Sequence, residues 1–401
     1  MAWNIGANDV ANSMGTSVGS GVITVRRAVF LAAILNILGA VLVGTHVTQV
    51  ISKGIVDPAV FSKDPTVFVY GMFASILSAG IWVTVATHMR LPVSTTHSVV
   101  GAIIGFGFIS SGISVINFSK LSAIILGWIV SPVAGALTAF ILFTIVKILV
   151  LDTDNPFKSA KKIFPFMVSL VFIVLTSAIL YKGLHWDLGG WEILIIIALI
   201  GILAGLLSRL LLGYYHKPEM DHYYPVENLF GYLQILSACC VAFAHGSNDV
   251  ANAIGPVAAV FQVVDGLANG ISRGMLQQTV EAPVWLLALG GVGIALGIAT
   301  WGYKVMSTIG GRITEVTPTR GFAAEFGTAI TVLACSLWGL PVSTSHVIVG
   351  SVVGVGFARG ISALNTDVIR SIIAAWLITI PAAAMLTMVI FEIISSIIIV
   401  L

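Results

Sequence analysis

Charged residues are scarce in this sequence: its 401 residues include 19 Lys and Arg and 17 Asp and Glu, or 9% of the chain. Soluble domains carry about 25% charged residues, so this scarcity excludes a water-soluble globule. Cysteine is also sparse, and the three cysteines lie in apolar runs, which excludes a disulfide scaffold and a zinc site. No polar stretch is long enough to form a soluble head domain, and the net charge of +2 is too balanced for a nucleic-acid partner.

Apolar residues make up 58% of the chain and form long runs. Runs of about 20 apolar residues predict membrane-spanning helices, whereas the alternating ten-residue strands of a membrane barrel are missing from the sequence. We therefore expect an all-α, polytopic protein with the lipid bilayer as its solvent, in the inner (plasma) membrane. The predicted spans are Ala28–Ile51, Thr66–Thr87, Leu121–Leu151, Ile163–Tyr181, Trp191–Tyr215, Leu229–Ala244, Pro283–Ile309, Gly321–Trp338 and Val368–Leu401.

Four further apolar stretches are too short or too polar to span a membrane simply. Irregular backbone occurs at membrane depth only where protein or a cavity satisfies its polar groups, so we expect broken helices and the functional site in these stretches. Two of the long spans also contain a proline, Pro132 and Pro381, where kinks are expected. The four stretches are Met1–Gly21, Pro92–Ser110, His245–Phe261 and Pro341–Gly360.

The four stretches form two pairs of repeated motifs. The sequence GANDVAN at Gly6–Asn12 recurs as GSNDVAN at Gly246–Asn252, and LPVSTTH at Leu91–His97 recurs as LPVSTSH at Leu340–His346. This order indicates a duplicated half, which we place at residues 1–151 and 228–401 with connecting helices at 152–227. Interrupted segments at matching positions of two halves indicate a transporter binding site.

The first motif pair supplies carboxylates and amides. Helical residues three apart share a face, so Asp9 can converge with Asn12, and Asp249 with Asn252. Each aspartate costs about 2.5–3.5 kcal/mol at the bilayer centre when unpaired, and neither motif contains Lys or Arg. Hard oxygen ligands suit a small cation such as sodium, so a mobile cation is the expected partner.

The second motif pair supplies hydroxyls: Ser94, Thr95 and Thr96 in one half and Ser343, Thr344 and Ser345 in the other. Each cluster follows a proline and precedes an apolar run, the pattern of a capped helix N-terminus. Such an N-terminus binds anions, and two of them facing each other suit a tetrahedral oxyanion. Interhelical hydrogen bonding is the alternative role for these hydroxyls.

Five more residues are candidates for this site: Asn8, Asn248, Glu325, His97 and His346. Glu325 lies in an apolar run and has no acidic counterpart in the other half, so we predict a cation ligand or proton relay. The two histidines follow the hydroxyl clusters and can act as ligands, as proton carriers or in packing. His245 receives no assigned role.

The doubled motifs at Gly6–Asn12 and Gly246–Asn252, with PVST-x-H at Pro92–His97 and Pro341–His346, resemble the inorganic phosphate transporter family. The resemblance covers both halves and implies inorganic phosphate as substrate, with sodium or protons as the driving ion. It also implies two inverted repeats with re-entrant hairpins, a homodimer and an elevator-like movement. It assigns phosphate to the six hydroxyl residues and sodium to Asp9, Asn12, Asp249 and Asn252.

We therefore predict a sodium-coupled phosphate importer that is not an enzyme and needs no cofactor. Proton-coupled or metal–phosphate symport by the same site is the alternative. A passive anion channel is disfavoured because it needs no buried carboxylates. An intramembrane enzyme is a further rival, in which Asp9, Asp249, His97 and His346 would hold a divalent metal.

Overall fold

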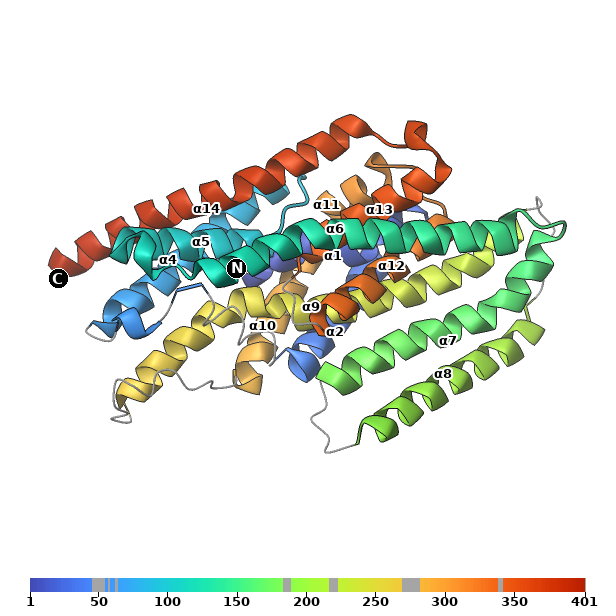
Figure 1. Ribbon diagram of the computed structural model, residues 1–401, viewed down its shortest axis with the longest axis horizontal. Coiled ribbons are helices and arrows are strands. Elements are labelled where there is room, and N and C mark those ends of the chain that lie inside the picture. Colours follow the sequence, from blue (N-terminus) through green and yellow to red (C-terminus); the bar gives the residue numbers. More distant parts are fainter. Residues whose placement is uncertain are drawn as a thin grey trace.

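The computed structural model describes residues 1–44, 55–56, 58–61, 64–182, 189–215, 223–268, 282–337 and 342–400. β-Pairing within these ranges is limited to an isolated bridge between Val56 and Ile116, and nearly all the rest is helical. The long helices lie side by side in an elongated bundle (Figure 1). The predicted all-α fold class is confirmed.

The helices form a first and a second part of the chain, joined by a pair of helices. The first part of the chain forms α1 (Ala2–Gly19), α2 (Val25–Val43), α4 (Pro65–His88), α5 (Thr95–Ser111) and α6 (Phe118–Val146). Two helices connect the first part to the second: α7 (Pro156–Lys182) and α8 (Gly190–Gly213). The second part contains α9 (Tyr224–Ala268), α10 (Val284–Trp301), α11 (Tyr303–Ser307), α12 (Pro318–Leu337), α13 (Thr344–Arg359) and α14 (Thr366–Val400).

Eight helices among the described residues are long and apolar enough to cross a membrane. They coincide with eight of the nine predicted spans. The remaining predicted span falls in α12, which carries the fully buried Glu325 and does not belong to the eight. The ends of three predicted spans, at Ile51, Trp338 and Leu401, lie outside the described residues.

The predicted breaks around the Asp motifs are wrong. The stretch Met1–Gly21 forms the regular helix α1, and α9 continues without a break from the predicted span at Leu229–Ala244 through the motif. The motif glycines serve packing instead: a methyl group at Gly6 would lie 1.9 Å from the Ile294 carbonyl oxygen, and one at Gly246 would lie 2.3 Å from that of Asn36. Small residues allow such close approach of helix backbones.

The short helices α5 and α13 each pack against the other half as well as their own. Helix α5 of the first half packs on α14 of the second, and α13 of the second half packs on α6 of the first. Glycines make both contacts possible, since a methyl group at Gly101 would lie 2.6 Å from Ile380 O and one at Gly350 would lie 2.1 Å from Pro132 O. The halves therefore share one core, and α6 and α14 remain continuous helices through Pro132 and Pro381.

A bulkier residue in this contact should destabilise the fold. In Gly354→Val, the added Cβ would lie 2.0 Å from Ala136 O, which is backbone and cannot rotate away. We expect a loss of about 3 kcal/mol, visible as a lower thermal unfolding midpoint in detergent. Gly311→Ala is the matched control because no atom lies within 4 Å of its added Cβ, and an equal loss in both variants would refute the packing role.

Helices α1 and α9 run in opposite directions past each other. Asp9 lies near His245, whereas Ser20, at the other end of α1, donates a hydrogen bond to Gln234 at 2.8 Å. As the residue number rises from 9 to 20 along α1, the number of the contacting residue falls from 245 to 234 along α9. The motif of α1 consequently faces the motif of α9 at the middle of both helices.

Candidate functional site

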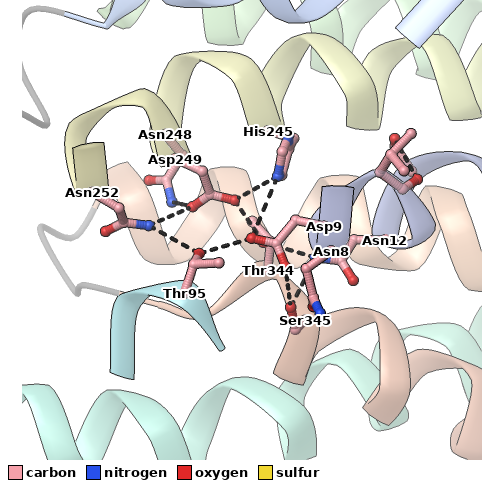
Figure 2. Close-up of polar contacts among 12 residues, drawn as sticks. Asn8, Asp9, Asn12, Thr95, His245, Asn248, Asp249, Asn252, Thr344 and Ser345 are labelled. Atoms are coloured by element: carbon pink, nitrogen blue, oxygen red, sulfur yellow. Dashed lines mark hydrogen bonds and ion pairs between the residues drawn. The ribbon is translucent and has the colours of Figure 1, made fainter. Parts of the chain in front are cut away.

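The two motif aspartates meet inside the bundle (Figure 2). Asp9 comes from α1 and Asp249 from α9, and their exposed fractions are 0% and 1%. Among the described residues, no Lys or Arg pairs with either carboxylate. The sequence predicted convergence within each motif, of Asp9 with Asn12 and of Asp249 with Asn252, whereas the structure also brings together the carboxylates of both motifs.

His245 is the side chain that lies between the two aspartates. Its Nε2 atom is 2.9 Å from Asp249 Oδ2 and 3.9 Å from Asp9 Oδ2, and the three residues place ligand atoms within 4.8 Å of one another. Sequence reasoning missed this residue, although a signal was present: His245 is four positions before Asp249 and therefore on the same helix face. The matching residue of the first half is Ile5, so one histidine serves both carboxylates.

The hydrogen bonds around His245 determine which nitrogen faces the carboxylates. Asn36 on α2 donates its amide to the Ala32 carbonyl at 2.8 Å, and its Oδ1 lies 2.6 Å from His245 Nδ1. An amide oxygen only accepts, so Nδ1 carries a proton and donates it. Nε2 is therefore the nitrogen available to a proton or a cation between the aspartates.

Hydroxyls from the starts of α5 and α13 complete the carboxylate shell. Thr95 donates to Asp9 Oδ2 at 2.7 Å, and its counterpart Thr344 donates to Asp249 Oδ2 at 2.8 Å. Ser345 also donates to Asp9 Oδ1, at 3.1 Å. The six predicted hydroxyl residues are all buried, and three of them, Thr95, Thr344 and Ser345, donate to the aspartates.

The motif asparagines reach across to the hydroxyls of the opposite half. Asn12 Nδ2 donates to Ser345 at 2.8 Å and to Thr344 at 3.3 Å. Asn252 Nδ2 makes the equivalent contacts, to Thr96 at 3.1 Å and to Thr95 at 3.3 Å. The oxygen of the Asn12 amide, Oδ1, is buried without a hydrogen-bond partner, which leaves a hard acceptor in the cluster.

The predicted helix caps are present at both hydroxyl clusters. Ser94 and Ser343 are the N-cap residues of α5 and α13, and their hydroxyls accept from the backbone N–H groups of His97 and His346. The first turns of these helices therefore point toward the cluster. Pro341, which precedes the second cap, lies outside the described residues.

The two other motif asparagines have different roles. Asn8 holds the segment between α4 and α5 in place through two hydrogen bonds. Its amide donates to Leu91 O at 3.0 Å, and its oxygen accepts from Val93 N at 3.2 Å. Asn248 instead donates to Asp249 Oδ1 at 3.0 Å. Asn8 thus positions the first hydroxyl cluster, while Asn248 contacts a carboxylate directly.

His97 and His346 lie behind the hydroxyl clusters and pack against aromatic rings. Their ring centroids are 4.4 Å apart, His97 lies 3.7 Å from Trp128, and His346 lies 3.7 Å from Trp376. His346 Nδ1 is also 3.3 Å from Trp128 O, a carbonyl that α6 leaves free because Pro132 has no N–H. The metal set of Asp9, Asp249, His97 and His346 considered above is therefore not assembled; His245 occupies that place.

Glu325 forms a second buried polar cluster. Its Oε1 accepts from Thr16 at 2.5 Å and from Ser17 at 2.7 Å, and its Oε2 accepts from Ser237 at 2.9 Å. The residue is fully buried in α12 and ties together α1, α9 and α12. Because Thr16 and Ser17 lie further along α1 than Asp9, this cluster is separate from the aspartate pair.

A bundle of membrane-spanning helices with doubled Asp–Asn motifs in its centre is typical of a solute transporter of the membrane. The chain belongs to the phosphate transporter family, whose sequence profile matches residues 5–387. The resemblance inferred from the motifs is thereby confirmed, and the family consists of transporters rather than enzymes. The chain is a multi-pass membrane protein.

The descriptions of similar proteins agree with this family assignment. A protein of Pyrococcus abyssi described as a phosphate permease is 45% identical over 396 residues, which cover 98% of this chain and 95% of the relative. The inorganic phosphate transporter 2-1, chloroplastic, of Arabidopsis thaliana is 41% identical, covering 97% of this chain and 69% of its own. A solved structure titled the sodium-dependent phosphate transporter superposes with a TM-score of 0.90 at 41% identity, covering 99% of this chain and 96% of that one.

Proposed function

We propose that this protein imports inorganic phosphate together with sodium. One observation carries the proposal: Asp9 and Asp249, from matching motifs of two halves, share a buried cluster with the hydroxyls of two helix N-termini. A phosphate anion beside two carboxylates is untenable in a low-dielectric site without cations. Coupling between phosphate and cation then follows from charge neutrality.

Sodium fits the oxygen donors of the cluster. Asp9, Asp249 and Asn252 offer side-chain oxygens, and Asn12 Oδ1 is already buried without a donor. Hard oxygen ligands of this kind suit small, hard cations. We assign sodium to these four residues, with Asn248 as a further neighbour of the Asp249 carboxylate.

Phosphate is assigned to Ser94, Thr95, Thr96, Ser343, Thr344 and Ser345. Thr95 and Thr344 donate their hydroxyl protons to the carboxylates in this structure. A cation bound to the carboxylates would satisfy those oxygens, so the hydroxyls could turn toward phosphate together with the free N–H groups of the first helical turns. The same hydroxyls would thus link the two substrates.

The driving ion is tested by phosphate uptake into proteoliposomes. A sodium gradient and a proton gradient are imposed separately, and we expect saturable uptake with the sodium gradient alone. Uptake that is indifferent to sodium would refute the sodium assignment. Uptake that never saturates and needs no cation would instead indicate a channel.

His245 favours a second candidate, the symport of a divalent metal with phosphate. An imidazole nitrogen beside two carboxylates is a donor set that suits a transition metal better than it suits sodium. The same proteoliposomes distinguish the two, because metal–phosphate symport requires the divalent ion and co-transports it in fixed ratio. Proton coupling is the outcome if the proton gradient alone drives uptake.

Glu325 is proposed as an additional cation ligand. In Glu325→Gln we expect the sodium concentration for half-maximal uptake to rise about tenfold, because a hydrogen-bonded carboxylate charge worth about 1.5 kcal/mol or more is lost. The apparent affinity for phosphate should change little, since Glu325 is separate from the six hydroxyls. Unchanged sodium dependence would leave Glu325 a purely structural residue; Glu315→Gln, at an exposed carboxylate, is the control.

We also propose that residues 1–151 and 228–401 are inverted repeats. The opposite course of α1 and α9 and the packing of α5 and α13 against the other half support this arrangement. Single cysteines at Ile113 and Ile361, both exposed just beyond α5 and α13, should then be labelled from opposite faces of the membrane. Labelling from one face would refute inversion.

The elevator-like movement, the homodimer and the inner-membrane location are proposals implied by family membership. The buried cluster has to open alternately to both sides for transport, which a shift of the site across the membrane would achieve. Mass photometry of the protein in nanodiscs tests the dimer, and membrane fractionation tests the location.

A further inference from the structure

A groove of about 680 Å³ lies between α7 and α8, away from the transport site. The two helices touch at its floor, where a methyl group on Gly205 would lie 2.1 Å from Ser169 Oγ. Three lysines from the start of α7 and one arginine from the end of α8 line one part of the groove: Lys158, Lys161, Lys162 and Arg209. Apolar side chains, including Phe166 and Leu206, line the rest.

The four cations have no acidic partner in the described part of the chain. The ion pairs found there involve His245, Arg320, Arg359 and Arg370, and none joins a carboxylate to a cation of the groove. Four unneutralised positive charges in one groove repel one another. An anion bound among them would relieve this repulsion.

The surroundings of the groove indicate an amphipathic anion. Its apolar walls are open to the outside of the bundle, with Phe166 62% and Leu206 54% exposed, and the outer face of α8 continues this apolar surface. The cations lie at the end of the bundle where α6 leads into α7 and where α8 ends (Figure 1). Tyr214, directly after α8, and Tyr224, at the start of α9, are both exposed. Exposed tyrosines are typical of a membrane–water interface.

We propose that this groove binds one anionic phospholipid. The headgroup phosphate would lie among Lys158, Lys161, Lys162 and Arg209, and an acyl chain would lie along Phe166 and Leu206. Basic pockets between helices at the cytoplasmic face bind anionic headgroups in this way. Inorganic phosphate would satisfy the same cations but would leave the apolar walls uncovered, so the lipid is the occupant that matches both parts of the groove.

Native mass spectrometry of the full-length protein, titrated with phosphatidylglycerol or phosphatidylcholine, tests the proposal. We expect phosphatidylglycerol to remain bound and phosphatidylcholine to dissociate. In K158Q/K161Q/K162Q/R209Q, phosphatidylglycerol affinity should fall by about 100-fold or more, because each cation near a lipid surface contributes about one factor of five. The control R26Q/R27Q/R312Q/R370Q removes four other cations and should keep the affinity.

Phosphate uptake by both variants establishes that they are folded, since neither set belongs to the transport site. Equal affinity for the two lipids, or an unchanged affinity in the groove variant, would overturn the proposal. Displacement of phosphatidylglycerol by excess inorganic phosphate would also overturn it, because the site would then be one for free phosphate. A change of oligomeric state without loss of lipid would identify the groove as a contact between copies of this chain.

Discussion

Asp249→Asn is expected to reduce cation-driven phosphate uptake by about 100-fold, because a charged ligand that contributes about 3 kcal/mol is lost. Asparagine has the same shape, and its amide oxygen can still accept from Thr344, whose hydroxyl donates to Asp249 Oδ2 at 2.8 Å. The substitution therefore removes charge with little change in packing. Initial uptake rates in proteoliposomes, over a range of sodium concentrations, measure the effect.

The two halves provide a matched comparison. Asp9→Asn should cause a loss of similar size, since Asp9 accepts from Thr95 as Asp249 accepts from Thr344. Asp152→Asn, at an exposed position after α6, should leave uptake unchanged. Near-normal sodium dependence in Asp249→Asn, with the thermal midpoint of the parent protein, would contradict the role of this carboxylate in cation binding.

His245→Ala is expected to destabilise the protein by about 3–5 kcal/mol, the usual cost of removing one partner of a buried ion pair. The change leaves Asp9 and Asp249 without their shared neighbour and takes from Asn36 Oδ1 the donor that lies 2.6 Å away. Thermal unfolding of the purified protein measures the loss. Sodium in the buffer should reduce it, because a cation between the carboxylates replaces the imidazole.

A double-mutant cycle separates this effect from simple loss of packing. Removal of one carboxylate lowers the need for a cation, so His245→Ala should cost less in the Asp9→Asn background than in the parent. Equal costs in the two backgrounds would refute the electrostatic role of His245. His88→Ala, at an exposed histidine that ends α4, is the control for loss of an imidazole.

Local spacing was enough to predict much of the fold and part of the site. Apolar runs located the membrane helices, and the Pro-Val-Ser-Thr pattern located the caps Ser94 and Ser343, because a span length and a cap depend on neighbouring residues. The prediction of a helix break before Gly246 was wrong, because a motif rich in Gly and Asn can also form a closely packed helix. The structure reveals that the packed helix applies, because a methyl group added at Gly246 would lie 2.3 Å from Asn36 O.

The sequence by itself determined the membrane as the solvent, the family, and the chemistry of the two motif pairs, since these follow from composition and short-range pattern. Tertiary structure decided which groups meet. Asn12 and Ser345 are 333 positions apart yet hydrogen-bonded at 2.8 Å, and His245 serves the carboxylates of both halves. Such contacts depend on how closely glycine-lined helices approach and cross, which no local pattern specifies.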